Sequence, residues 1–390
     1  MTHVAVIEFL IHLLIFFLGA GIGSFLNVVV YRLPLGISVN NPKRSFCPSC
    51  KKQIPWYQNL PLFSWVLLRG KCASCASKIP FRYFFVELLT ACVFYAVFLK
   101  FRGSWDTRLE WGDVVLLYWI FTALLIAGTF IDIDHFILPH EITFGGLAVG
   151  LLGGFLVPEA VLENSLSDGD RTRGFLAALT GACIGGSLLW CVVQLGKLAF
   201  GRIKKSFEKP TPWSVTQPND QEPPLFEIAE DKLTWHDLFF RPTDRLMLTC
   251  TALTVNERTF GPAKLEIRED KLKVQPDTGE SVGFAFEKVT KLEGQATFVL
   301  IPREAMGYGD IFLLAMIGSF LGWQAVLFTI FAASVLGTLF AVIPRIFGKT
   351  EWSNKIPFGP YLAGGAMIWL FYGRQFADWY LGRLGGGFDF

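Results

Sequence analysis

Long apolar runs separated by shorter polar segments make up most of the chain. The runs lie at residues 4–30, 84–99, 114–131, 142–157, 174–196, 311–343 and 361–372. Because a helix needs about 20 apolar residues to cross a bilayer, the run at 311–343 is long enough for two helices that turn near Gly322 and Trp323. The pattern predicts a mainly α, polytopic membrane protein with about eight transmembrane helices.

The amino-acid composition agrees with this class. Hydrophobic residues make up 52% of the 390 residues, charged residues make up 17%, and the mean hydropathy is +0.43. These values are typical of a membrane protein and unlike those of a soluble domain. The first run is expected to be a retained helix, since no small-residue cleavage site of a secretory signal follows it.

Basic residues predict which helix ends face the cytoplasm. The segment 31–82 holds nine Lys and Arg residues and no Asp or Glu, which is a strong positive-inside signal. Alternation of the helices then puts the segments 132–141, 197–310 and 344–360 on the cytoplasmic side too. The basic segment is also expected to lie against anionic membrane lipid, where each Lys or Arg contributes about 1 kcal/mol.

Two carboxylates stand at the cytoplasmic ends of helices that are far apart in the sequence. Asp132 follows the run at 114–131, and Asp310 precedes the run at 311–343. Two neighbouring Asp side chains that share a proton can activate water and protonate a carbonyl oxygen, so the pair predicts aspartic proteolysis. The alternative is that both are solvated interfacial groups, with Asp310 complementing the dipole of its helix.

Four neighbours of this pair are candidates for supporting roles. Gly307 and Gly309, in the sequence GYGD, are expected to permit unusual backbone conformations and the close approach of another chain segment. Asp134 and His135 follow directly after Asp132. Of these, Asp134 is expected to be a solvated bystander.

A further acidic residue, Glu87, lies one turn inside the second predicted helix. An ion pair with Arg82, which is near in sequence, is the expected role. Contact with an amine of a substrate is the alternative, because ionisable groups within membrane helices are often functional.

Two Cys-x-x-Cys knuckles lie in the basic segment. They comprise Cys47 with Cys50 and Cys72 with Cys75, and 21 residues separate them. Four thiolates at this spacing predict a tetrahedral, structural Zn²⁺ site that gives a small loop its fold. Disulfides are the alternative, but the reducing cytoplasm disfavours them.

Residues 203–303 interrupt the membrane pattern. The Pro-rich and charged stretch at 208–224 predicts a linker. Alternating stretches follow it, including a predicted hairpin at 265–274, so the insert is expected to be a β-rich cytoplasmic domain. Residues 201–305 hold 15 Lys and Arg against 17 Asp and Glu, which excludes a basic nucleic-acid-binding surface. Docking of a partner, gating of the site and simple space filling all remain open as roles.

Two other function classes could explain intramembrane acidic residues. A proton-coupled transporter would show internal repeats or broken helices near the midplane of the membrane, whereas these carboxylates are expected at its cytoplasmic edge. A non-catalytic scaffold stabilised by zinc would tolerate the loss of either Asp.

Several motifs together resemble a known family, the bacterial type IV prepilin peptidases, which are membrane aspartic proteases. The motifs, in order along the chain, are GSFLNVVVYRLP at 23–34, the two cysteine knuckles with NLPLFSWVLLRGKCASC at 59–75, RYFFVELLTA at 82–91, IDIDHFILP at 131–139, MGYGD at 306–310 and IPFGPYLA at 356–363. They extend along the whole chain apart from the insert.

The resemblance implies a multi-pass endopeptidase of the bacterial cytoplasmic (inner) membrane, with Asp132 and Asp310 as its catalytic pair. It implies cleavage of the short basic leader of type IV prepilins and secretion pseudopilins at the cytoplasmic face. It also implies N-methylation of the new amino terminus with S-adenosylmethionine, an activity associated with the cysteine-bearing loop. A peptidase without methyltransferase activity is the alternative, since no glycine-rich nucleotide loop follows a strand.

The chain departs from the family pattern at His140, where Asp is common, and at Phe312, where Lys is common. His135 and His140 are expected to tune or hydrogen-bond the site rather than bind metal. The expected domains are a first helix at 1–30, the zinc loop at 31–82, membrane domains at 83–202 and 304–390, and the insert at 203–303.

Overall fold

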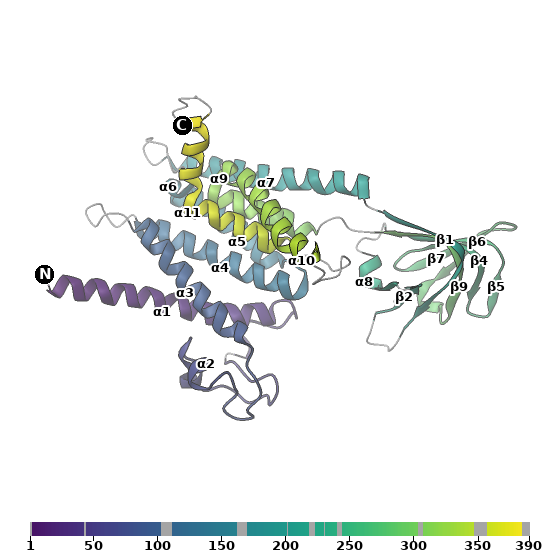
Figure 1. Cartoon of the computed structure of the whole chain (residues 1–390), viewed down its shortest axis with the longest axis horizontal. Coiled ribbons are helices and arrows are strands. Elements are labelled where there is room, and N and C mark those ends of the chain that lie inside the picture. The colour runs from purple at the N-terminus through teal and green to yellow at the C-terminus, as the bar shows by residue number, and fades with distance from the viewer. Residues whose placement is uncertain are drawn as a thin grey trace. The chain divides into compact units, whose positions relative to one another are not determined.

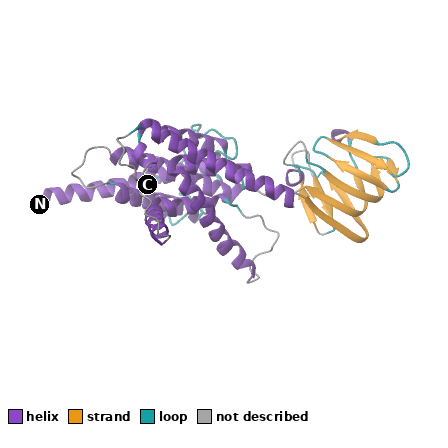
Figure 2. Cartoon of the chain, turned by 90° about the horizontal axis from the view of Figure 1, so that it is seen from above, coloured by secondary structure: helices purple, strands orange, loops and turns teal. Residues whose placement is uncertain are grey.

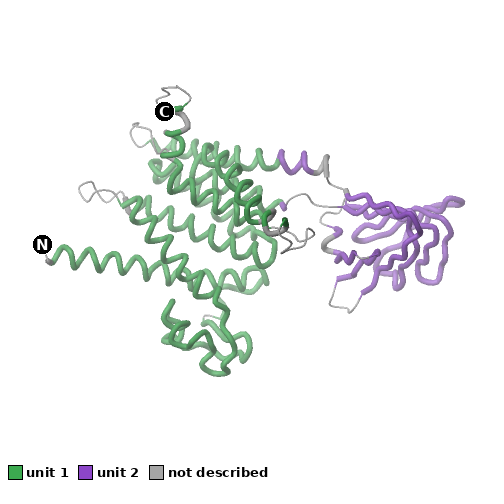
Figure 3. The backbone as a smooth tube through the Cα atoms, in the orientation of Figure 1, with its two compact units in different colours: residues 1–190, 308–390 green, residues 191–307 purple. Residues whose placement is uncertain are grey.

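The computed structural model describes the chain in ten segments, which are residues 2–42, 44–102, 111–161, 170–200, 202–217, 223–229, 231–239, 244–302, 307–346 and 357–383. The chain divides into two compact units (Figure 3). Unit 1 comprises Met1–Trp190 with Tyr308–Phe390, and unit 2 comprises Cys191–Gly307. Figure 2 shows that unit 1 is built from helices and that unit 2 is mostly strands.

The helices of unit 1 contain every apolar run that the sequence pattern singled out (Figure 1). The long helices are α1 (Thr2–Arg32), α3 (Phe81–Phe101), α4 (Trp111–His135), α5 (His140–Leu156), α7 (Arg171–Phe200), which continues into unit 2, α9 (Tyr308–Gly337) and α11 (Gly359–Arg383). The short ones are η1 (Trp56–Gln58), α2 (Phe63–Leu67), α6 (Pro158–Val161), the π-helix η3 (Thr338–Val342) and α10 (Ile343–Ile346).

Five of the described helices are long and apolar enough to span a membrane. They cover His3–Arg32, Phe81–Phe101, Asp113–His135, Arg171–Gly196 and Tyr308–Phe340. This is fewer than the eight predicted, for three reasons. The apolar helix α5 has only 17 residues, α9 continues into the next segment as one span, and α11 is polar over its second half.

The predicted turn near Gly322 is present as a kink inside α9. Gly322 has φ 78° and ψ 177°, whereas the residues on either side continue as helix. A side chain rarely adopts this positive φ, so glycine is the residue that permits the break. The kink divides α9 into two halves, and Asp310 lies in the first turn of the first half.

The helix α4 is the centre of unit 1, since it contacts α1, α3, α5 and α11. Its buried residue Phe121 also stacks on Phe320 of α9, with 4.7 Å between the ring centroids. On its other side, Ile126 and Ile131 of α4 join an apolar cluster with Leu26 of α1. The carboxyl end of α4 is thereby fixed against several neighbours, and Asp132 lies at that end.

Unit 2 is a sheet of nine described strands that are paired antiparallel throughout, in the order β3-β2-β1-β9-β4-β6-β7-β8, with β5 beside β4. The strands are β1 (Arg202–Thr216), β2 (Leu225–Ile228), β3 (Asp231–Thr234), β4 (Leu246–Val255), β5 (Arg258–Phe260), β6 (Ala263–Ile267), β7 (Lys271–Pro276), β8 (Val282–Ala285) and β9 (Leu292–Pro302). The short helices α8 (Trp235–Leu238) and η2 (Phe286–Lys288) complete it. The insert is therefore β-rich, as predicted.

Sequence patterns predicted one part of this sheet correctly and another part wrongly. The expected hairpin is formed by β6 and β7, with Ile267 opposite Leu272. The expected linker is wrong over 208–216, which belongs to β1, while residues 218–222 lie outside the described residues. Prolines are tolerated here because the register of β1 against β9 shifts between Ser206 and Thr211. Beyond this irregularity, Trp213 is buried in the core of the sheet.

Candidate active site and metal centre

The end of α4 presents Asp132 at a sharp change in chain direction. The helix ends at His135, and the next residue, Phe136, has a left-handed backbone with φ 56°. The N–H of Phe136 donates to the carbonyl oxygen of Asp132 at 2.9 Å, which closes the last turn. Pro139 then precedes α5 and cannot continue a helix from α4. Asp132 is thus held in the final turn, where the residue is 6% exposed.

The structure brings Asp132 together with Asp310. Asp310 lies in the first turn of α9, is 7% exposed, and is close enough to Asp132 for the two carboxyl groups to interact electrostatically. A third helix completes the arrangement, because the backbone N–H of Gly359 at the start of α11 donates to Oδ2 of Asp132 at 3.0 Å. The N-terminus of α11 favours a negative charge at this position. Two buried carboxyl groups therefore lie near each other, and the N–H of Gly359 binds one of them.

Leu138 packs closely against the first turns of α9 and α11. A Cβ atom built on Gly309 would lie 2.8 Å from Cβ of Leu138, and one built on Gly359 would lie 3.5 Å from its Cδ1. Glycine at 309 thus permits the close approach that the sequence predicted. Gly307 does not behave in this way, since an added Cβ would meet nothing within 4 Å, and neither glycine has a positive φ.

The neighbouring predicted residues do not join the two buried carboxyl groups. Asp134 forms an ion pair with Arg82 of α3, and both side chains are partly exposed. The predicted pair of Glu87 with Arg82 is therefore wrong. Glu87 instead accepts a hydrogen bond from the backbone N–H of Leu62 at 2.7 Å. His135 is exposed at the end of α4.

The two departures from the family pattern touch each other. The ring of His140 lies edge-on to Phe312, with 5.9 Å between centroids, and it also packs beside Phe144 at 5.4 Å. Phe144 and Phe312 are in contact in turn, at 4.6 Å. An aromatic cluster between α5 and α9 thus occupies these positions.

The four knuckle cysteines come together as predicted. Their Sγ atoms all lie within 4.8 Å of one another, and the pair Cys47 and Cys75 is 3.8 Å apart. A tetrahedral zinc site with Zn–S bonds of about 2.3 Å needs sulfur atoms about 3.8 Å apart, so this donor set fits the ion. All four are free thiols, which excludes the disulfide alternative in this structure.

The two knuckles repeat one backbone pattern. The residue after the second Cys of each knuckle, Lys51 or Ala76, has a left-handed backbone with φ 58° or 56°. Its N–H donates to the carbonyl oxygen of the first Cys, Cys47 or Cys72, at 2.8 Å or 2.9 Å. This turn directs both thiols of a knuckle to the same side, so two copies facing each other create the four-sulfur cluster.

Ser77 lies beside the thiols of Cys47 and Cys75 and lowers the pKa of both. Its Oγ lies 3.1 Å from Sγ of Cys75 and 3.6 Å from Sγ of Cys47. Hydrogen bonds, first from the backbone of Cys50 and then from the side chain of Ser77, lower the pKa of the Cys47 thiol to about 6. The hydrogen bonds from Ser77 also lower the pKa of Cys75. Since zinc binds thiolates, both effects favour metal binding at neutral pH.

Two residues of the buried site were not predicted from the sequence. Gly359 contributes a backbone N–H, which has no side-chain signature, although it lies in the quoted motif IPFGPYLA. Leu138 contributes only packing, and it lies in the quoted motif IDIDHFILP. The motifs marked the right segments, but the contacts themselves required the structure.

Comparisons with known proteins agree with the motifs. The family model described as Bacterial Peptidase A24 N-terminal domain matches residues 17–101, and the model described as Type IV leader peptidase family matches residues 292–342. No solved structure matches the chain.

Three curated relatives carry the name prepilin leader peptidase/N-methyltransferase. The protein of Aeromonas hydrophila is 28% identical over 395 residues, which covers 94% of this chain and 93% of the relative. The protein of Pseudomonas aeruginosa is 28% identical over 93% of this chain and 91% of the relative. The protein of Dichelobacter nodosus is 33% identical over 48% of this chain and 68% of the relative. The chain therefore belongs to the type IV leader peptidase family.

Proposed function

We propose that the chain is a membrane aspartic endopeptidase that removes the leader of type IV prepilins and pseudopilins at the cytoplasmic face. The observation that carries this proposal is the meeting of Asp132 and Asp310, which are buried, come from separate helices and interact electrostatically. A buried carboxyl group in a membrane helix is costly unless it is paired, solvated or used. Two such groups at one place form the acid and base pair that peptide hydrolysis needs.

The hydrogen bond from Gly359 suggests which carboxyl group acts as the base and which acts as the acid. A backbone N–H and a helix N-terminus both favour the ionised form of Asp132. In this arrangement Asp132 takes a proton from water as the water attacks the scissile carbonyl carbon. Asp310 gives its proton to the carbonyl oxygen. When the tetrahedral species breaks down, the departing amine receives the proton from Asp132, and Asp310 recovers a proton from the hydroxyl group of the new acid.

We further propose that the chain methylates the amino terminus that cleavage exposes, as the names of its relatives suggest for them. S-adenosylmethionine would supply the methyl group. The new terminal ammonium first releases a proton, and its nitrogen then forms a bond to the methyl carbon. The carbon–sulfur bond breaks with its electron pair going to sulfur, so S-adenosylhomocysteine is the second product.

The cysteine loop is proposed to hold a structural Zn²⁺ through Cys47, Cys50, Cys72 and Cys75. Zinc would supply cross-links that the small apolar core of the loop lacks. In the membrane arrangement that accompanies this proposal, α5, α11 and the two halves of α9 cross with the longer helices, giving eight spans. The basic loop then lies on the cytoplasmic side of the inner membrane.

The test of the peptidase activity compares the two buried carboxyl groups with an exposed one at the opposite end of α4. The parent chain, Asp132→Asn, Asp310→Asn and the control Asp113→Asn are reconstituted in vesicles with a prepilin-like substrate. Asp113 lies in the first turn of α4, the same helix as Asp132. Loss of either buried carboxyl group should lower the cleavage rate by about 10²–10⁴-fold or more, the contribution of general acid–base catalysis. Cleavage by both buried-site variants at the parent rate would refute the proposal.

A further inference from the structure

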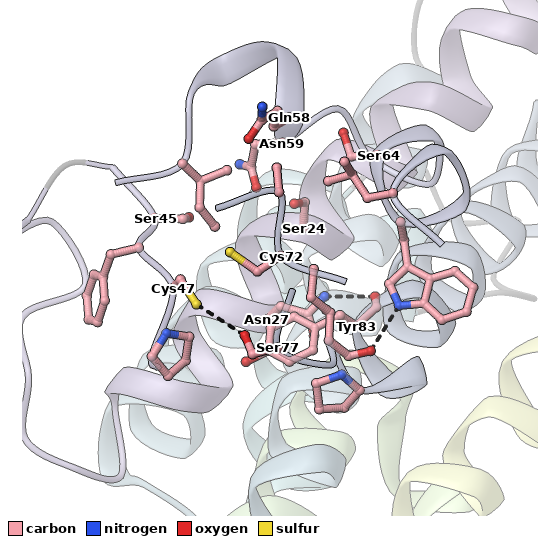
Figure 4. Close-up of a pocket in the computed structure, with 18 of the residues that line it drawn as sticks. Ser24, Asn27, Ser45, Cys47, Gln58, Asn59, Ser64, Cys72, Ser77 and Tyr83 are labelled. Atoms are coloured by element: carbon pink, nitrogen blue, oxygen red, sulfur yellow. Dashed lines mark hydrogen bonds between the residues drawn. The ribbon is translucent and has the colours of Figure 1, made fainter. Parts of the chain in front are cut away.

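The helices α1 and α3 are joined by polar contacts at both ends of their interface. Beside the cysteine loop, Nδ2 of Asn27 in α1 donates to the carbonyl oxygen of Tyr83 in α3 at 3.0 Å (Figure 4). At the other end, Nδ1 of His12 in α1 lies 3.0 Å from Oη of Tyr95 in α3. Nε2 of the same ring lies 3.1 Å from Nη1 of Arg102, which caps α3. Neither the proposed peptidase site nor the cysteine cluster uses His12, Tyr95 or Arg102.

The hydrogen bonds of this second cluster leave only donors free. Arginine has no acceptor atom, so Arg102 donates to Nε2, and the neutral imidazole of His12 carries its proton on Nδ1. That N–H therefore donates to the oxygen of Tyr95, whose own O–H proton has no acceptor among the described residues. The guanidinium of Arg102 keeps further N–H groups and lies over the ring of Phe98, 5.9 Å from its centroid. A ligand that completes the cluster must supply oxygen acceptors.

The end of α3 also carries more positive than negative charge. Among the residues that the structure describes, neither Arg102 nor Lys100 forms an ion pair. Lys100 donates to the backbone carbonyl oxygen of Phe371 in α11 instead. Glu8 lies one turn before His12 in α1, and it pairs with neither cation. Two cations and one carboxylate leave one positive charge, which favours an anionic ligand.

The length of α3 puts this cluster at the level of lipid headgroups. The helix has 21 residues, so it is about 32 Å long, close to the thickness of about 30 Å of the hydrocarbon core of a bilayer. With the cysteine loop at one membrane surface, Arg102 lies at the opposite surface. Leu13 and Leu99, which follow His12 and Phe98 in the chain, are 42% and 43% exposed. Apolar side chains exposed beside the cluster suit a ligand that also has acyl chains.

We propose that Arg102 and Tyr95 bind the headgroup phosphate of an anionic phospholipid, in the leaflet opposite to the cysteine loop. Both side chains donate to phosphate oxygens, His12 holds both in place, and Lys100 adds positive charge. The acyl chains lie along the two exposed leucines. A zwitterionic headgroup fits less well, since its own cation would approach two others. The bound lipid joins α1 to α3 at the end that the cysteine loop does not reach, and the proposal depends on neither enzymatic activity.

The test titrates the purified full chain, in neutral detergent micelles, with phosphatidylglycerol, phosphatidylethanolamine or phosphatidylcholine and counts bound lipids by native mass spectrometry. The parent should bind phosphatidylglycerol at least about fivefold more tightly than either zwitterionic lipid, the effect of one basic group beside an anionic lipid. Arg102→Gln should weaken phosphatidylglycerol binding about tenfold, the scale of a hydrogen bond to a charged group. Lipid bound by the basic residues of 31–82 is common to the parent and this variant.

Tyr95→Phe provides a second, milder variant, because it keeps the ring and removes only the hydroxyl. It should weaken phosphatidylglycerol binding about threefold to tenfold. The rise in melting temperature that phosphatidylglycerol causes should be smaller in both variants than in the parent.

Arg171→Gln is the matched control. Arg171 begins α7 and lies over the ring of Phe155, 6.0 Å from its centroid, so the variant loses the same charge and the same kind of ring contact. Asp170 precedes it, and no histidine or tyrosine contacts it among the described residues. The control should leave the affinity for phosphatidylglycerol within about twofold of the parent. Inorganic phosphate, which lacks acyl chains, should not displace the lipid.

Several results would overturn the proposal. One is equal or tighter binding of phosphatidylethanolamine by the parent, as expected if Glu8 met the ammonium of that headgroup. Another is a loss of affinity in Arg171→Gln as large as that in Arg102→Gln, which would show that any exposed arginine at a helix end has this effect. Unchanged affinity in both Arg102→Gln and Tyr95→Phe, or displacement of the lipid by inorganic phosphate, would also contradict it. Zinc content, measured on the same preparations, shows that each variant is folded at the cysteine loop.

Discussion

Gly359→Ala is the substitution that most directly disturbs the buried carboxyl pair without removing either carboxyl group. Gly359 donates its backbone N–H to Oδ2 of Asp132 at 3.0 Å. A Cβ atom at this position would lie 2.6 Å from the same oxygen, closer than real Cβ contacts allow. The backbone at Gly359 has no positive φ, so alanine is conformationally acceptable there and the effect comes from the contact alone.

The size of the effect follows from this distance. Ordinary contact begins near 3.4 Å, so the methyl group and the oxygen must separate by about 0.8 Å. That movement stretches the hydrogen bond to Asp132 and displaces the carboxyl group from Asp310. Displacements of about 1 Å in a catalytic group can lower the rate about 10²-fold. We therefore expect kcat/KM for leader cleavage to fall about 10²-fold, equivalent to about 2.7 kcal/mol of transition-state stabilisation.

The assay is single-turnover cleavage of a prepilin-like substrate in reconstituted vesicles. Gly145→Ala is the matched control, because Gly145 lies in α5 and an added Cβ there meets nothing within 4 Å. The control should cleave within about twofold of the parent, since a helix accepts alanine more readily than glycine. If Gly359→Ala and Gly145→Ala were equally active, the contact between Gly359 and Asp132 would have no part in catalysis.

Other parts of the structure make further predictions. Gly309→Ala should lower cleavage at least about tenfold because the new methyl group would meet Leu138 at 2.8 Å, whereas Gly307→Ala should be near the parent in the same assay. Cys72→Ser should reduce zinc from about one ion per chain to a trace, as elemental analysis would show, since a hydroxyl cannot replace a thiolate ligand. Burial raises the pKa of the Cys250 thiol to about 12, so at pH 8 this cysteine should resist alkylation until denaturant unfolds the insert, as peptide mass spectrometry would detect. Its labelling in the native chain would contradict the buried position.

The thiol of Cys250 also makes the stability of the insert depend on pH. The thiol of Cys250 has an ordinary pKa of 9.0, and burial raises it to about 12 in the folded chain. The folded state therefore keeps the proton that the unfolded state loses. This contribution to stability is fully present below pH 9 and disappears as the pH rises toward 12. Urea unfolding midpoints of Cys250→Ala should consequently fall less between pH 8 and pH 10 than those of the parent.

Some features of the site could be predicted because the sequence states them directly. Asp132 and Asp310 each border a long apolar run, so the run boundaries alone predict that they lie at a common membrane depth. The spacing of the four knuckle cysteines predicts a metal site, and the structure brings their sulfur atoms together. In both cases the chemistry depends on side chains whose type is visible in the sequence.

Other features could not be predicted because they depend on which groups the fold brings into contact. Arg82 is near Glu87 in sequence, but the fold places Asp134 beside it, and Glu87 holds a loop turn instead. The contact of Gly359 uses a backbone N–H, which every residue except proline carries, so the sequence does not mark it. The strand β1 was hidden by its prolines, which fit only because the pairing with β9 is irregular at that point.

The central claim is that Asp132 and Asp310 act as one catalytic unit, and a double-mutant cycle tests it most directly. Leader cleavage is measured for the parent, Asp132→Asn, Asp310→Asn and the double variant, each confirmed to be folded and to contain zinc. Residues that act as a unit show strongly non-additive losses. Each single variant should lose nearly all activity, and the double variant should lose little more. Losses that multiply in the double variant, or single variants that cleave like the parent, would contradict it.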